Sequence, residues 1–318
     1  MDEQKIQILI DKIRGAKSIA IMGHKNPDGD SLCSVLALSR LIELNFGITP
    51  DCVYDGNLPD YLDDVPLRPH MRYYERVDTS APYDLVFLLD YGIAQNIGGT
   101  RGIVDAAKFV IEIDHHINEN PIGAGLCLND TSAAATAQIV YDIMRAAAWK
   151  MDIDAANLMT IGIITDTGQF CFVNNGYVMR VVADLVDFGV SLRNVTSLIS
   201  AKERDTILLE TRVVSRAEFF HKNRLALATV LRGEYRHLDG KGATAMKLLG
   251  QIRGVEYVVL LKQQKENQTG VSIRSRMRPI SHIAAALGGG GHPCAAGAVV
   301  NDTLENVRAR VIELFEGE

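Results

Sequence analysis

The sequence has few cysteines, and their spacing excludes several classes of protein. The five are Cys33, Cys52, Cys127, Cys171 and Cys294. They are odd in number, and no two have the close spacing of a zinc-binding or redox motif. Most lie among apolar residues, where a buried free thiol is the usual outcome. We therefore exclude a disulfide-rich secreted domain and expect a reducing compartment, the cytoplasm.

Long apolar runs and a surplus of positive charge are also missing. No apolar stretch reaches the roughly 20 residues that a membrane-spanning helix needs. The start of the chain mixes acidic, basic and apolar residues at helical spacing, which predicts a helix and not a signal peptide. The formal net charge of −6 argues against a protein that coats long nucleic acid. We expect neither a membrane nor a long nucleic acid as partner.

The order of the predicted elements indicates an α/β fold with two domains. Strand-like segments at 17–24, 48–56, 84–90 and 108–114 alternate with helix-like segments at 30–47, 130–149 and 154–170. This alternation is typical of a parallel sheet with helices on both faces. Asp130, Thr131 and Ser132 are candidate N-caps of the helix at 130–149. We expect a first domain at 1–187, a connecting helical segment at 188–218 and a smaller mixed α/β domain at 219–318.

Acidic and histidine side chains follow the predicted strands of the first domain. They are His24, Asp28 and Asp30 after the first strand, Asp90 after the third, and Asp114, His115 and His116 after the fourth, with Asp166 at the end of an apolar helix. A regular strand points successive side chains to opposite faces, so the run of three at 114–116 must straddle a strand end. The ends of parallel strands share one edge of the sheet, where ligands bind.

Several aspartates in one cleft need cations to stay ionised. Two like charges about 4 Å apart cost on the order of 4 kcal/mol at an effective dielectric of about 20. A set of carboxylates and imidazoles without thiolate favours Mn²⁺ or Mg²⁺. A lone Asp at a strand end is most often a cap or turn residue, but chance rarely fills nearly every strand end this way. The set therefore predicts a metal site, and two metals sharing a carboxylate would suit phosphoryl chemistry.

The second half of the chain has a glycine run and regularly spaced arginines. Four glycines precede His292, which would let backbone amides approach an anion closely. A flexible hinge is the alternative. Arg274, Arg276 and Arg278 alternate, so they would share one face of a regular strand. Such a stripe suits phosphate or base recognition or a solvated sheet face, and spacing alone does not decide.

Taken together, these residues resemble the DHH phosphoesterase family. The resemblance rests on HKNPDGD at 24–30, Asp90, DHH at 114–116, Asp166 and GGGGH at 288–292. It covers nearly the whole chain, including a DHH-associated domain of the kind that carries the glycine-rich motif. Within the family, the two-domain plan resembles bacterial nanoRNases that also act as phosphatases of 3'-phosphoadenosine 5'-phosphate (pAp). It implies a parallel-sheet DHH domain joined by a helical connection to a smaller mixed α/β domain.

The resemblance also implies roles for individual residues. Two divalent ions, Mn²⁺ or alternatively Mg²⁺, would be held by two sets that share Asp90: His24, Asp28 and Asp90, and Asp30, Asp90, His115 and Asp166. Asp114 would orient a ligand histidine and His116 would face the substrate phosphate, so Asp90, Asp114 and His116 are the expected catalytic residues. The nucleotide would be held by His116 with Arg274, Arg276, Gly289, Gly290, Gly291 and His292.

The implied activity is hydrolysis of very short oligoribonucleotides, such as pApA, to mononucleotides, together with dephosphorylation of pAp. A homodimer fits the family, although no interface signature is visible. Three alternatives stay open: a stand-alone cyclic di-AMP or pApA phosphodiesterase, an inorganic pyrophosphatase, and a non-catalytic nucleotide-binding regulator. Cys33, Gln138 and the segment after Asp90 depart from the family pattern, which bears on substrate preference more than on catalysis.

Overall fold

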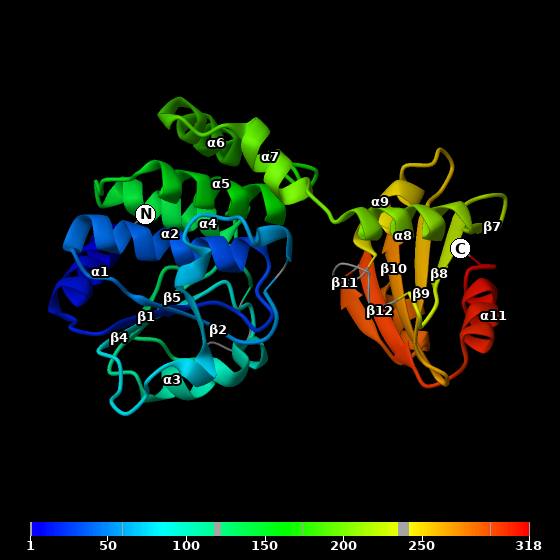
Figure 1. The fold of residues 1–318 in the computed structure, drawn as a ribbon, viewed down its shortest axis with the longest axis horizontal. Helices are drawn as coiled ribbons and strands as arrows, with labels where there is room; N and C mark the ends of the chain where they lie inside the picture. The colour runs from blue at the N-terminus through cyan, green and yellow to red at the C-terminus, as the bar shows by residue number, and fades with distance from the viewer. Residues whose placement is uncertain are drawn as a thin grey trace. The chain divides into compact units, whose positions relative to one another are not determined.

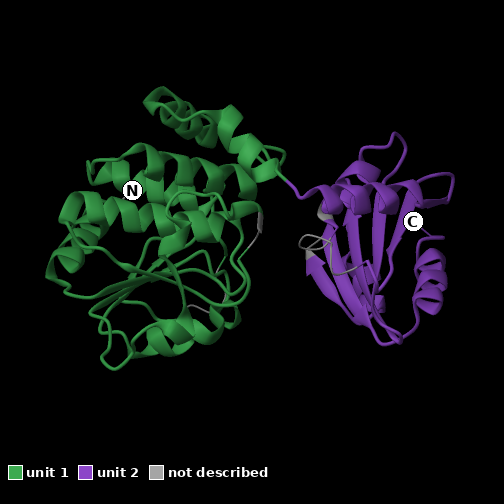
Figure 2. Cartoon of the chain, in the orientation of Figure 1, with its two compact units in different colours: residues 1–201 green, residues 202–318 purple. Residues whose placement is uncertain are grey.

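The protein folds into two compact units, Met1–Ala201 and Lys202–Glu318 (Figure 2). The computed structural model describes residues 2–58, 60–117, 122–173, 175–234, 242–292 and 294–317. The predicted connecting segment spans the division between the units. Helix α7 (Leu192–Ser200) belongs to unit 1 and helix α8 (Arg204–Ser215) to unit 2. The boundaries at 187 and 218 stay predictions.

Unit 1 is built on a sheet of six parallel strands in the order β3-β2-β1-β4-β5-β6. The strands are β1 (Ile19–Met22), β2 (Asp51–Tyr54), β3 (Met71–Tyr73), β4 (Leu85–Leu89), β5 (Val110–Ile113) and β6 (Leu126–Cys127). From the central pair β1 and β4, the chain continues to β2 and β3 on one side and to β5 and β6 on the other. The strand order therefore reverses direction between β1 and β4, which is called a topological switch point. Open α/β sheets bind ligands at such a point, outside the carboxyl ends of the strands.

Helices cover both faces of this sheet (Figure 1). The larger core lies under α1 (Glu3–Gly15), α2 (Gly29–Phe46), α4 (Thr136–Ala146), α5 (Ile153–Asp166), α6 (Tyr177–Phe188) and α7. The smaller core lies under α3 (Arg101–Ala106) and the 3-10 segment η4 (Ala94–Thr100). Three more 3-10 segments are η1 (Asp60–Leu62), η2 (Arg68–His70) and η3 (Tyr74–Arg76). Burial on both faces explains why the central strands read as continuous apolar runs.

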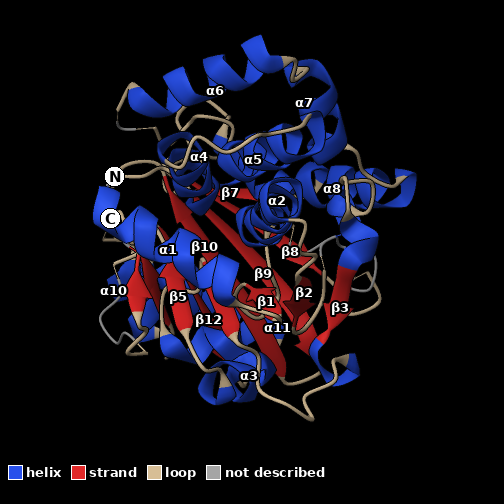
Figure 3. Ribbon diagram, turned by 90° about the vertical axis from the view of Figure 1, so that its left-hand side faces the viewer, coloured by secondary structure: helices blue, strands red, loops and turns tan. Residues whose placement is uncertain are grey.

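Unit 2 contains a mixed sheet in the order β11-β12-β10-β9-β8-β7, in which only β8 and β9 pair in parallel among the described strands. The strands are β7 (Glu218–Phe220), β8 (Leu225–Val230), β9 (Tyr257–Lys265), β10 (Gln268–Ser275), β11 (Gly290–His292) and β12 (Ala295–Val300). Helices α8 and α9 (Ala243–Gly250) pack on one face, and α10 (Ser281–Ala286) and α11 (Leu304–Leu314) on the other. Figure 3 distinguishes helices from strands in both units.

The predicted α/β class, with a parallel sheet followed by a smaller mixed sheet, is confirmed. Two local predictions are wrong. Helix α4 begins at Thr136, because Asp130 instead forms a turn in which its carboxylate accepts from the backbone N–H of Ser132. Strand β10 ends at Ser275, so Arg276 and Arg278 do not continue the face on which Arg274 lies. No helix in the described ranges combines the length and apolar character needed to cross a membrane.

Candidate metal centre

The turn after β1 supplies three side chains and leads directly into α2. Asp28 is the N-cap of this helix, and its Oδ1 accepts hydrogen bonds from the backbone N–H groups of Asp30 (3.0 Å) and Ser31 (3.1 Å). The Nε2 atom of His24 lies 3.7 Å from Asp28 Oδ1. At Gly29 an added Cβ would lie 2.4 Å from the hydroxyl oxygen of Thr165. This close approach of α2 and α5 brings Asp30 to Asp166, which ends α5.

Asp90 follows β4 at the centre of the sheet and faces residues from both neighbouring strands. Its side chain is buried, and its backbone is in the left-handed region with φ of 53°, a conformation that for residues other than glycine is concentrated at functional sites. Asp90 Oδ2 lies 3.8 Å from His24 Nε2, whereas Oδ1 lies 3.5 Å from His115 Nε2. The two oxygens of one carboxylate therefore face two different histidines.

The three residues after β5 point in different directions. Asp114 is fully buried, and its Oδ2 accepts from the backbone N–H groups of Tyr91 (2.9 Å) and Gly92 (2.8 Å). Its Oδ1 accepts from the backbone N–H of His116 and lies 2.7 Å from Nδ1 of the same residue. Asp114 therefore orients His116, and the expectation that it orients a ligand histidine stays a prediction. His115 points instead toward Asp166, with 3.4 Å between its Nε2 and Asp166 Oδ2.

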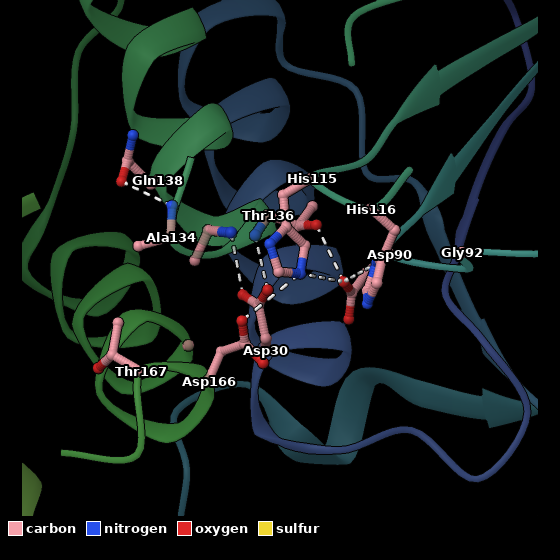
Figure 4. Close-up of polar contacts among 12 residues, drawn as sticks. Asp30, Asp90, Gly92, His115, His116, Ala134, Thr136, Gln138, Asp166 and Thr167 are labelled. Atoms are coloured by element: carbon pink, nitrogen blue, oxygen red, sulfur yellow. Dashed lines mark hydrogen bonds and ion pairs between the residues drawn. The ribbon is translucent and has the colours of Figure 1, made fainter. Parts of the chain in front are cut away.

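Asp30 is held by the first turn of α4 (Figure 4). Its Oδ2 accepts from the backbone N–H of Thr136 at 2.6 Å, and its Oδ1 accepts from that of Ala137 at 2.9 Å. The hydroxyl of Ser34 donates to the same Oδ1 at 3.0 Å. The hydroxyl of Thr136 donates to Asp90 Oδ1, also at 3.0 Å. These contacts fix the two buried carboxylates before any cation binds.

Three groups of ligand atoms result, each with its members within 4.8 Å of one another. The groups are His24, Asp28 and Asp90; Asp30, His115 and Asp166; and Asp90, His115 and His116. The first two contain all six residues predicted to bind metal. His115 Nε2 is buried without a hydrogen-bond partner in the described part of the chain, and a metal ion is the natural partner for such an imidazole nitrogen. The donor set therefore fits divalent cations that prefer carboxylate and imidazole.

Burial and mutual repulsion shift the pKa values of the carboxyl groups. Burial, followed by the charge of Asp166, raises the pKa of Asp30 to about 7. Burial, followed by the charge of Asp28, raises the pKa of Asp166 to about 6. The pKa of Asp90 rises well above its ordinary value, again through burial first and the charge of Asp30 second. The cluster carries more negative charge than it can hold without cations.

These shifts predict that the metal-free protein loses stability as pH rises from 3.8 to about 7. In that interval Asp30 is protonated in the folded state and ionised in the unfolded state. Where the folded state binds more protons, the free energy of unfolding falls with rising pH. The raised pKa values of His24 and His116 act in the same direction above 6.5.

Thermal unfolding in the presence of a chelator measures this effect. We expect stability to fall less steeply with rising pH in the Asp30→Asn variant. We expect the same of the unmodified protein when Mn²⁺ replaces the chelator. A metal-free protein that becomes more stable over the same interval would contradict the electrostatic description.

Apart from His116, which lies in unit 1 with the metal-binding residues, the predicted nucleotide-binding residues lie in unit 2. Arg274 is exposed on β10, and Arg276 follows the end of this strand. Gly290 and Gly291 lie in β11, and the side chain of His292 is outside the described residues. Unit 2 has a pocket of about 360 Å³ whose lining includes Lys262, Gln264, Ser272, Gly289 and Gly297. A Cβ on Gly289 would lie 2.1 Å from the carbonyl oxygen of Gly297, so this position requires glycine.

Sequence reasoning missed two side chains that contact the carboxylates, Ser34 and Thr136. Ser34 lies one helical turn after Asp30, a spacing that places both on the same face of α2. From that spacing, the contact between Ser34 and Asp30 could have been predicted. Thr136 is distant in sequence from Asp30 and Asp90, so no local pattern marked it.

Known proteins match the chain over nearly its full length. Residues 18–163 match the DHH family, N-terminal domain, and residues 227–317 match the DHHA1 domain. The chain is 31% identical to the bifunctional oligoribonuclease and PAP phosphatase NrnA of Thermus thermophilus, over 99% of this chain and 94% of that protein. It is 27% identical to the protein of the same name from Bacillus subtilis, over 89% of each.

A solved structure shows the same fold. An exopolyphosphatase-related protein from Bacteroides fragilis aligns with a TM-score of 0.90 and 20% identity, over 99% of this chain and 96% of that one. The matches to the DHH and DHHA1 families cover the parallel sheet of unit 1 and most of unit 2. The chain therefore belongs to the DHH family, with a DHHA1 domain in its second unit.

Proposed function

We propose that this protein is a metal-dependent phosphoesterase that hydrolyses very short oligoribonucleotides to mononucleotides and dephosphorylates pAp. One observation carries the proposal: Asp90, at the switch point of the sheet, faces His24 through one carboxylate oxygen and His115 through the other. A carboxylate placed this way suits a bridge between two metal ions. The whole-length similarity to relatives named as oligoribonucleases and PAP phosphatases supports the choice of substrates.

Two divalent ions, for which we propose Mn²⁺, would be held by the two sets that share Asp90. One set is His24, Asp28 and Asp90, and the other is Asp30, Asp90, His115 and Asp166. Bound there, the ions would polarise a phosphoryl oxygen and make a water acidic enough to act as nucleophile near neutral pH. The protein contributes carboxylates that are already fixed by hydrogen bonds, so little reorganisation is needed when cations bind.

His116 is the proposed contact to the substrate phosphate. Its side chain is 47% exposed, unlike those of Asp90 (3%) and His115 (14%). Asp114 holds the ring through Nδ1, and Nε2, on the other side of the ring, has no hydrogen bond to any residue that the structure describes, so it could approach a phosphate oxygen. A fixed donor aimed at charge that develops during the reaction lowers its barrier.

We also propose that Arg274, Arg276 and the glycine run bind nucleotide in unit 2, and that the protein works in the cytoplasm. Arg274 is exposed on a strand that borders the unit 2 pocket. Guanidinium groups recognise phosphate through paired donors. A cytoplasmic location is supported by five cysteines that are all free thiols, as expected in a reducing compartment.

A product-resolved time course with Mn²⁺ tests the proposed function. The substrates are pAp, a ladder of short RNAs, a long RNA and pyrophosphate. We expect rapid loss of pAp and of the shortest RNAs, slow attack on long RNA, and no turnover when a chelator removes the metal. Equal rates on long and short RNA, or hydrolysis of pyrophosphate alone, would contradict the proposal. No hydrolysis of any substrate would favour a nucleotide-binding regulator.

A further inference from the structure

The first residue of α4 contacts two carboxylates that come from different elements. The backbone N–H of Thr136 donates to Asp30 Oδ2 at 2.6 Å, and its hydroxyl donates to Asp90 Oδ1 at 3.0 Å. Thr136 is fully buried. One residue thus connects Asp30, at the start of α2, with Asp90, which follows β4. Buried carboxylates need hydrogen-bond donors, and Thr136 supplies one donor to each.

Asp30 takes the place of a local cap for α4. The N-cap residue Ala135 has no side chain able to accept a hydrogen bond, and the first two amides of the helix, at Thr136 and Ala137, donate to Asp30 instead. The first amides of a helix require such acceptors, and the positive end of the helix stabilises a negative charge. The position of α4 and the orientation of Asp30 therefore depend on each other.

The two hydrogen bonds of Thr136 both reach carboxylate groups on the side of the site where His115 lies. Its hydroxyl reaches Oδ1, the oxygen that faces His115, and not Oδ2, the oxygen that faces His24. Asp30 belongs to the group with His115 and Asp166. Thr136 thus donates hydrogen bonds to two of the four residues proposed for the second metal position, Asp30 and Asp90. Among the residues of the first position, these two hydrogen bonds reach Asp90 alone, through the oxygen that faces His115.

We propose that Thr136 is a positioning residue that sets the affinity of the second metal position, formed by Asp30, Asp90, His115 and Asp166. This inference rests on the proposed two-metal centre. The hydroxyl holds Asp90 Oδ1 in one orientation, while the adjacent amide holds Asp30. Loss of a hydrogen-bond partner behind a metal ligand typically weakens metal binding by about 10- to 100-fold. The first position, formed by His24, Asp28 and Asp90 Oδ2, keeps its own contacts.

A titration with Mn²⁺, followed by the electron paramagnetic resonance signal of the free ion, measures both positions without any substrate. Thr136→Val keeps the shape of the side chain and removes the donor. We expect the variant to bind the second ion about 10- to 100-fold more weakly and the first ion as the unmodified protein does. Thr136→Ser, which restores a hydroxyl, should recover most of the second affinity.

Thr160→Val is the matched control. Thr160 is also fully buried, but its hydroxyl donates to the carbonyl of Ala156 in its own helix. Equal weakening by both valine variants, equal weakening of both positions in Thr136→Val, or no weakening at all would each overturn the inference. If the unmodified protein bound fewer than two ions, the two-metal centre itself would be wrong, which separates the two failures.

Discussion

Replacing Asp90 by Asn should reduce hydrolysis of pAp by more than about 100-fold, the upper end of the effect expected for residues that only support a metal ligand. The amide of Asn has one oxygen instead of two, so it could serve only one of the two proposed metal positions. Asn also tolerates the left-handed backbone that Asp90 adopts. Initial rates with Mn²⁺ measure the effect, and a rate within a few-fold of the original would remove Asp90 from the mechanism.

Two comparisons separate lost chemistry from lost folding. Burial, followed by repulsion from the charge of Asp30, raises the pKa of Asp90 well above its ordinary value. Removal of one charge should therefore leave the thermal stability of the metal-free protein unchanged or higher. Asp105→Asn makes the same chemical change at an exposed residue that pairs with Arg101 at 2.7 Å. That variant should keep its stability, because an exposed ion pair contributes little to it. It should also keep its activity, because Asp105 is not one of the proposed site residues.

Replacing His116 by Gln should lower kcat by about 10²- to 10³-fold, the typical cost of removing one fixed donor from a developing negative charge. His116 is the more exposed of the two adjacent histidines, and its ring is held by Asp114 rather than by the proposed metal ligands. Single-turnover rates on pAp measure the chemical step directly.

Metal binding distinguishes the roles of the two histidines. His116→Gln should still bind two Mn²⁺ ions, whereas His115→Gln should lose the second, since His115 lies between Asp90 and Asp166. Loss of an ion in His116→Gln would show that His116 is a ligand, because its Nδ1 also lies 3.6 Å from Asp90 Oδ1. That outcome would contradict the role proposed for it.

The elements that carry the site were predictable because their patterns are strong. The apolar runs of β1, β4 and β5 end where polar residues begin, and parallel strands place such ends along one edge. Short strands escaped prediction. Three-residue β3 and β7 and two-residue β6 are too short to show a period of two.

Interactions between distant residues were not predictable from local rules. Helix α4 has polar residues at 130–132 that read as caps, but its first amides use Asp30, which is 106 positions away from Thr136. Asp114 pairs with His116 in a turn of three residues. The sequence shows that Asp114 lies near two histidines, but only the backbone geometry determines that it pairs with His116 and not with His115. The spacing of the arginines likewise could not reveal that β10 ends at Ser275.

The most direct test of the central claim is the ratio of initial rates on pApA and on cyclic di-AMP, measured with Mn²⁺ under identical conditions. A phosphoesterase for very short linear oligoribonucleotides should convert pApA to mononucleotides much faster than it opens the cyclic compound. Faster hydrolysis of cyclic di-AMP would contradict that claim and identify the protein as a cyclic dinucleotide phosphodiesterase.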